Sequence, residues 1–233
     1  MNHLKTFLTS ALIAGTSMSA YADLSIPYGI EALTSYRSEY VHRGFELAND
    51  TIDFQLSSRV SLANDFSINA TAWYNNELDD GDFNEFGIYL DLRKDIGDMT
   101  YALGTTFHDY DDSFFEDGFD IFGSATWHIN KCVDLGASVS YDTGADGWYG
   151  ELFSSYYYSI NDHSFVTLRG GVSAVDGYYG REGFNDVFAK LAYTYDINES
   201  VSVSPYIATS ILLDGDDLGN DSFYGGVYFA VSF

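Results

Sequence analysis

Apolar side chains recur at every second position through most of the chain beyond residue 28. One stretch shows this clearly, with Phe66, Ile68, Ala70, Ala72 and Tyr74 set against Ser67, Asn69, Thr71 and Trp73. A period of two places successive side chains on opposite faces of a β-strand, so each strand meets two different environments. The pattern predicts twelve strands, over residues 28–41, 52–62, 66–74, 86–92, 99–107, 119–129, 133–141, 148–160, 164–174, 187–197, 201–213 and 223–233.

Two kinds of connection alternate between these strands. Five are short and rich in Asn and Asp, as hairpin turns are: 63–65, 94–98, 130–132, 161–162 and 198–200. The six others are longer: 44–50, 75–85, 108–118, 142–147, 175–183 and 214–221. Short turns on one side and longer loops on the other are typical of bacterial outer-membrane barrels, which also have an even number of strands.

The predicted fold is therefore all-β, a twelve-stranded antiparallel transmembrane β-barrel with both ends of the chain on the periplasmic side. The strands have about the 9–11 residues that a tilted membrane strand needs. A periplasmic β-sandwich is the alternative, since it also alternates polar and apolar faces. The barrel is favoured by aromatic residues near strand ends, where interfacial girdles are expected: Tyr74, Tyr110, Tyr141, Trp148, Tyr156, Tyr158, Tyr193 and Tyr195.

Charged residues inside the predicted strands fall on the polar face. An Arg or Lys facing lipid at the middle of a bilayer costs about 2–4 kcal/mol, whereas one facing a wet lumen costs little. The segregation therefore predicts that these side chains point into the barrel. The predicted lumen-lining residues are Arg37, Asp53, Arg59, Asp91, Arg93, Asp120, Glu151, Arg169, Asp186 and Lys190.

The first 22 residues have the order of a secretory signal peptide. A positive charge at Lys5 precedes an apolar and small-residue run from Phe7 to Met18, and Ala20 and Ala22 mark an expected cleavage site. The run is shorter than the roughly 20 apolar residues that a membrane-spanning helix needs. We expect residues 1–22 to be removed and residues 23–233 to form the barrel, after export through the periplasm to the bacterial outer membrane.

Composition narrows the partners of the chain. With 35 acidic residues against 10 Lys and Arg, the formal charge is −25, so nucleic acid should be repelled. Cys132 is the single cysteine, which rules out an internal disulfide framework, and no Cys/His cluster suggests a zinc site. We therefore expect no cofactor. The expected partners are outer-membrane lipid and lipopolysaccharide.

The end of the chain reads GVYFAVSF, residues 226–233. This segment resembles the C-terminal insertion signal of outer-membrane barrels, in which a glycine is followed by alternating hydrophobic residues and a final Phe. The resemblance rests on Gly226, Phe229, Val231 and Phe233. It implies recognition by the barrel assembly machinery. The last strand is expected to pair with the first, with its apolar face toward lipid.

The predicted interior mixes ions with hydrogen-bonding groups, which favours a channel for passive diffusion of small polar or cationic solutes and no enzyme. Twelve strands leave room for a narrow passage, between filled eight-stranded barrels and open sixteen-stranded porins. Alternatively, the ions pair across the interior and make a plugged barrel. Bulky residues on the inward face favour that alternative: Trp73, Tyr89, Phe122, Tyr149, Phe153, Tyr157 and Tyr206.

The longer loops are strongly acidic. Their carboxylates are Glu77, Asp79, Asp80, Asp82, Glu85, Asp109, Asp111, Asp112, Glu116, Asp117, Asp214, Asp216, Asp217 and Asp221. Such a rim attracts cations and repels anions. The second functional hypothesis is therefore a structural or adhesive barrel whose loops contact partners or bridge divalent cations. No loop completes the calcium-binding pattern, so a solvated rim is favoured.

Catalysis is considered because outer-membrane phospholipases also have twelve strands. They need a serine, a histidine and an orienting polar group near the outer rim. His108 lies at an outer strand end, but its parity points it inward and no partner serine is identified. His42 has no obvious nucleophile nearby, and His128 and His163 fall at the periplasmic end.

The first predicted strand contains LTSYRSEYVHRG, from Leu33 to Gly44. An acidic loop and a second alternating strand follow it. This opening resembles that of the TorF-type porins, in which a Leu-Thr-Ser start precedes an aromatic residue and an Arg-Gly pair. The matching residues here are Leu33, Thr34, Ser35, Tyr36, Arg43 and Gly44. The resemblance implies a small outer-membrane channel.

Overall fold

The chain folds into a single closed barrel of twelve strands. The computed structural model describes residues 28–78, 81–213 and 219–233, so the expected signal peptide and the carboxylates at 79, 80, 214, 216 and 217 lie outside the described residues. The strands are β1 (Tyr28–His42), β2 (Phe45–Ser61), β3 (Phe66–Glu77), β4 (Asn84–Ile96), β5 (Met99–Asp111), β6 (Gly118–Asn130), β7 (Val133–Asp142), β8 (Gly147–Asn161), β9 (Ser164–Tyr178), β10 (Arg181–Asp196), β11 (Val201–Leu212) and β12 (Ser222–Ser232).

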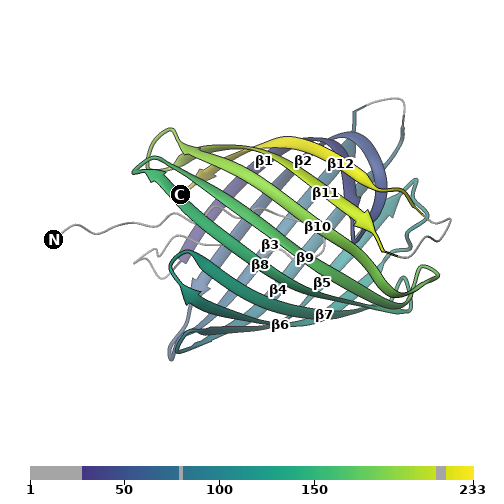
Figure 1. Cartoon of the computed structure of the whole chain (residues 1–233), viewed down its shortest axis with the longest axis horizontal. Helices are drawn as coiled ribbons and strands as arrows, with labels where there is room; N and C mark the ends of the chain where they lie inside the picture. Colours follow the sequence, from purple (N-terminus) through teal and green to yellow (C-terminus); the bar gives the residue numbers. More distant parts are fainter. Residues whose placement is uncertain (1–27, 79–80, 214–218) are drawn as a thin grey trace.

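Each strand pairs antiparallel with its neighbour in sequence, and β1 closes the cylinder against β12. In that closing pair Leu33 lies opposite Ala230 and Tyr36 opposite Val227. The tilted strands enclose one interior, and the chain's C-terminus lies at the left end in Figure 1. The predicted fold class is confirmed: this is a twelve-stranded antiparallel transmembrane β-barrel.

Burial in this barrel is inverted relative to a soluble domain. Large apolar side chains cover the outside; Leu103 is 65% exposed and Leu152 is 62% exposed. Buried residues are mostly polar or charged, and Asp53 is only 2% exposed. Contact of the apolar face with hydrocarbon explains the inversion, because water would make that surface unfavourable. Among the described residues, no helix is long and apolar enough to cross a membrane.

Several of the large inward rings lie directly over glycines of the neighbouring strand. Trp73 is paired with Gly87, and Phe153 with Gly136. A Cβ added at either glycine would overlap the ring. The glycines therefore let these rings lie flat against the wall of the barrel, where aromatic side chains cover the exposed backbone.

Two of the predicted long loops are wrong. Residues 45–50 belong to β2, and 175–183 is divided between β9 and β10, so the connections are the two-residue turns 43–44 and 179–180. Both residues of each turn have positive φ: Arg43 51° and Gly44 79°, then Tyr179 47° and Gly180 82°. This is the geometry of tight hairpin turns whose twist matches that of the strands. The chain continues as strand through these regions because such a turn needs no loop.

Two side chains also face differently from the prediction. Tyr110 was expected in an outer aromatic girdle, but it stacks on His108, with ring centroids 5.4 Å apart, inside the barrel mouth. The two residues share the parity of β5, which carries both inward. Glu85 was expected in an acidic loop, but it is 0% exposed within β4. The acidic rim is therefore smaller than the sequence suggests.

The position of a charge on the outer face should decide its effect on stability. We expect Leu90→Arg, in the middle of β4, to lower the free energy of unfolding by about 2–4 kcal/mol, because the guanidinium would lie at the bilayer midplane. Ile96→Arg at the end of the same strand is the matched control, with an expected loss of about 0–1 kcal/mol. Urea unfolding in lipid vesicles measures both. Equal losses at the two positions would contradict the membrane orientation of β4.

Candidate functional site in the barrel interior

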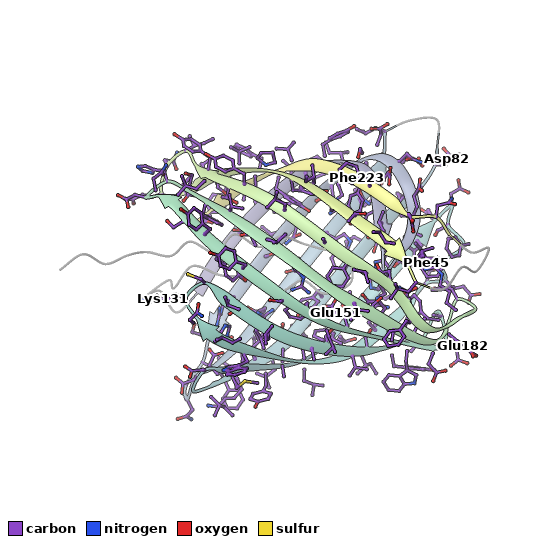
Figure 2. The ribbon with its side chains drawn as sticks, viewed as in Figure 1. Phe45, Asp82, Lys131, Glu151, Glu182 and Phe223 are labelled. Atoms are coloured by element: carbon purple, nitrogen blue, oxygen red, sulfur yellow. The ribbon has the colours of Figure 1, made fainter. Side chains whose placement is uncertain are left out.

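The interior of the barrel is the candidate site, and all ten residues predicted for it point away from the lipid face. Arg37, Asp53, Asp91, Arg93, Asp120, Glu151, Asp186 and Lys190 are buried, and Arg59 and Arg169 are partly buried. Figure 2 shows Glu151 in the middle of the barrel, between the end that carries Lys131 and the end that carries Phe45 and Glu182.

Three of the predicted basic residues bind carboxylates. Arg37 Nη2 lies 2.6 Å from Asp53 Oδ2, and Arg93 Nε lies 2.8 Å from Asp91 Oδ2. Arg169 Nη2 lies 2.7 Å from Glu151 Oε1. Buried charges are costly unless they are paired and hydrogen-bonded, so each pair offsets part of the desolvation of both partners.

Asp186 and Lys190 are stabilised in other ways. Asp186 accepts hydrogen bonds from Ser173, Ser210 and Asn185. The Lys190 ammonium donates to the Tyr228 hydroxyl at 2.7 Å. Neither residue forms a salt bridge with another described residue.

The outer end of the barrel is narrowed by the β1–β2 tip, residues 40–45, every one of which is buried. Arg43 projects from the turn into the mouth. Its two Nη atoms lie 3.2 and 2.6 Å from the two carboxylate oxygens of Asp120, and they also donate to Ser140 and Tyr178. A bidentate Arg–carboxylate pair fixes geometry as well as adding energy. The tip is therefore bound to the opposite wall.

The bonds of Arg43 to Asp120, Asp142, Ser140 and Tyr178 form what we call the Arg43 latch. The electrostatic environment keeps its guanidinium charged. Burial alone would lower the pKa of the Arg43 guanidinium, but the charges of Asp120 and Asp142 outweigh that effect and raise its pKa well above the ordinary value. Backbone carbonyls of the tip are held as well: Asn185 donates to the Arg43 carbonyl at 2.9 Å and Arg181 to the Gly44 carbonyl at 3.2 Å.

A second polar cluster lies beside the latch. His108 lies between two carboxylates, with Nδ1 2.8 Å from Glu85 and Nε2 3.2 Å from Asp120. Tyr40 donates a hydrogen bond to the other oxygen of Glu85. The β1–β2 tip is thus connected to β4, β5 and β6 through carboxylates on both sides of one imidazole.

Aromatic rings cover this polar layer from outside. Phe45, Phe115, Tyr149, Val175 and Tyr178 form one buried cluster. Phe115 stacks on Tyr179 with centroids 4.1 Å apart. In the conformation described, the buried tip and these rings pack together at the outer end of the interior.

Sequence reasoning missed Arg43, Arg181, Glu85, Tyr178 and Asp142 as parts of the interior, because all five fall in or beside segments expected to be loops. The two tight turns at 43–44 and 179–180 do have a signal in the sequence. Each is a pair whose second residue is glycine, Arg43-Gly44 and Tyr179-Gly180, flanked by extended segments. Their partners across the barrel depend on strand register, which one sequence does not give.

The histidines do not assemble the serine-dependent site of a hydrolase. His128 Nε2 lies 3.0 Å from Thr100 Oγ1 and Nδ1 lies 2.9 Å from Asp134, which superficially resembles a triad. However, the Thr100 hydroxyl donates its proton to Asp95 at 2.6 Å. The hydroxyl beside this imidazole is thus committed to a carboxylate other than the one that contacts the ring. The expected absence of enzyme activity stays a prediction.

The fold is shared with solved bacterial outer-membrane barrels. An outer membrane channel from Pseudomonas putida aligns over 92% of this chain and 98% of its own, with a TM-score of 0.60 and 9% identity. A KdgM porin aligns over 88% of this chain and 99% of its own, with a TM-score of 0.57 and 8% identity. These likenesses define the class of fold, a small porin-like barrel.

An enzyme of the same architecture is also similar. Outer membrane phospholipase A from Escherichia coli covers 87% of this chain and 92% of its own, with a TM-score of 0.51 and 13% identity. No family model and no curated protein sequence matches the chain. The TorF-type resemblance therefore stays a prediction.

The Arg43 latch gives a prediction for stability. Asp120→Asn should lower the free energy of unfolding by about 3 kcal/mol, because it leaves the buried Arg43 charge without its bidentate partner. Asp109→Asn is the control: it removes an exposed carboxylate from the same region, and little change is expected. Urea unfolding of the barrel refolded in detergent measures both variants. A loss no greater for Asp120→Asn than for Asp109→Asn would show that the latch does not contribute.

Proposed function

We propose that this protein is an outer-membrane channel for the passive diffusion of small polar or cationic solutes. One observation carries the proposal: the enclosed interior is built mainly from charged and hydroxyl-bearing side chains, while the large apolar side chains face outward. A barrel that only had to be filled would be served equally well by apolar packing, because buried ion pairs give little or no net stability over hydrophobic residues of similar volume. A polar interior suits a path for water and small solutes.

Passage through the described conformation is restricted at the outer end. We infer that the β1–β2 tip is the main barrier, because Arg43 ties it to the β6 and β7 wall through Asp120 and Asp142. Opening then requires these bonds to exchange for bonds to water or solute. Solute passage through this channel should therefore be slower than through open porins, and the channel should be narrower.

The remaining acidic loops favour cations on approach. The exposed carboxylates Asp109, Asp111, Asp112 and Glu116 lie at the outer end of β5 and in the loop after it. Their field extends only about 10 Å at 0.1 M salt, so it acts on entry and not on the interior. One of the similar structures is a KdgM porin solved in complex with disordered oligogalacturonate, an example of a barrel of this shape that meets a solute.

The proposal includes the route to the membrane. Residues 1–22 direct export, the barrel assembly machinery recognises the segment ending in Phe233, and the apolar outer face contacts lipid and lipopolysaccharide. Exposed apolar side chains at both ends of β12, Phe223 and Phe233, agree with lipid contact along that strand.

Planar-bilayer recording tests the channel. The refolded chain should produce discrete conductance steps, small for a porin, with a reversal potential that shows a preference for cations in a salt gradient. Insertion is checked in parallel by resistance of the folded barrel to protease in vesicles. Clean insertion without any conductance would reject the channel and favour the structural or adhesive barrel.

The latch should control the size of those steps. We expect Arg43→Ala to raise the unitary conductance, since the tip loses its bonds to Asp120, Ser140 and Tyr178. Lys131→Ala, in a turn at the opposite end of the barrel, removes the same charge and should leave the conductance unchanged. An Arg43→Ala channel that conducts like the wild type would place the barrier elsewhere.

The assembly segment is tested separately from stability. Phe233→Ala should reduce the amount of barrel assembled in the outer membrane of cells, with little effect on the unfolding of refolded protein. Phe223→Ala is a close control, because both Phe side chains are 71% exposed and lie at opposite ends of the last strand. Equal assembly of the two variants would argue against recognition of the terminal Phe.

A further inference from the structure

Lys190 differs from the other buried cations of the barrel. The residue is 5% exposed, and its ammonium makes one hydrogen bond, to Tyr228, while lying 4.0 and 4.4 Å from the ring centroids of Tyr206 and Tyr228. No carboxylate oxygen of a described residue lies within 4.0 Å of its nitrogen. An ammonium has three protons to donate, and a buried charge is normally paired.

Other positive charges lie around it. Arg169 is directly opposite Lys190 in the pairing of β9 with β10, and the charges of Arg37 and Arg169 both act on the Lys190 ammonium. Like charges directly opposite each other on a sheet are destabilising. This arrangement is unfavourable unless something negative joins it.

The carboxylates nearby are already committed. Asp53 binds Arg37 and Glu151 binds Arg169, so two carboxylates serve three cations. In addition, the buried Nε of Arg169 has no hydrogen-bond partner. When Lys190 is protonated, these three cations exceed the two carboxylates by one charge, and both the ammonium and the Arg169 Nε have a proton left to donate.

The surroundings of Lys190 provide a platform with small neighbours. Tyr206 and Tyr228 stack on each other with centroids 4.8 Å apart. They belong to a cluster that also contains Ala192, Ala208 and Ala230. The cluster is completed by Leu33, with Tyr224 packed against it, so hydroxyl-bearing rings lie beside the ammonium among mostly small apolar side chains.

The geometry points to a binding site for the carboxylate of a small organic acid, formed by Lys190, Arg169 and Arg37 and faced by Tyr206 and Tyr228. A carboxylate accepts several hydrogen bonds and would supply the missing negative charge. The inference rests on the proposed channel only for access to the interior. The acidic outer loops do not oppose it, because salt screens their field whereas a buried charge is screened much less.

Binding of a carboxylate to this site can be measured independently of ion conduction. The full mature chain is refolded in detergent, and its thermal unfolding is followed in sodium acetate and in sodium chloride at equal ionic strength and pH. A ligand that binds only the folded state raises the unfolding temperature. We expect acetate to raise it above the chloride value in a saturable way.

Substitutions test whether the stabilisation by acetate depends on Lys190. Lys190→Gln should weaken the apparent acetate affinity by about tenfold or more, because it removes a charge-assisted hydrogen bond. Arg59→Gln is the matched control, since it removes one positive charge from the inward face elsewhere and should keep the acetate effect. Lys190→Met is a second variant in case the glutamine variant folds poorly.

An acetate effect in the wild type no larger than that of chloride would overturn the site, and so would an effect that persists in both Lys190 variants. Loss of the effect in Arg59→Gln to the same extent would also overturn it, because the interaction would then depend on overall charge. Bilayer recording remains independent: silent bilayers with Lys190-dependent acetate binding would reject the channel and leave the site standing.

Discussion

The whole structure depends on a wall one residue thick between hydrocarbon and a polar interior. Lipid offers no hydrogen bonds to the backbone, so the ladder must close on itself, as it does where β1 meets β12. In such a wall each side chain faces either the hydrocarbon or the polar interior. That constraint explains why the apolar Leu103 is 65% exposed while the charged Asp53 is 2% exposed.

Large inward side chains fit inside the barrel because glycines lie opposite them on the neighbouring strand. Phe153 lies over Gly136 on β7 and faces Gly171 on β9. The Arg169 guanidinium then covers the ring, 3.7 Å from its centroid, and binds Glu151. The Phe153 ring thus lies between the backbone of Gly136 and the Arg169 guanidinium. Bulky inward residues therefore do not by themselves plug the barrel, since some of them form its lining.

The sequence predicted the strands and the facing of charges well because both follow from a local period of two. Residues 44–50 were expected to be a loop because Glu46, Ala48 and Asp50 break the apolar alternation, yet this segment meets the interior and the aqueous rim and so has no need of apolar positions. The latch could not be predicted, because Arg43 meets Asp120 only through a turn that folds inward and a register set by the four intervening strands, β2 to β5.

The distribution of ion pairs inside the barrel bears on what it is for. Arg37 and Arg169 bind carboxylates on the neighbouring strand, and Arg93 binds Asp91 within β4, so these three pairs lie within the wall of the barrel. At the outer mouth, by contrast, Arg43 comes from the only described tight turn of the outer end whose tip is wholly buried, and its partners lie on the far wall. A pair within the wall resists deformation of the wall, but a pair across the opening resists passage. The interior thus separates ion pairs within the wall from a set of bonds across the outer mouth, made by Arg43, Asn185 and Arg181, which is the arrangement expected of the narrow channel proposed above.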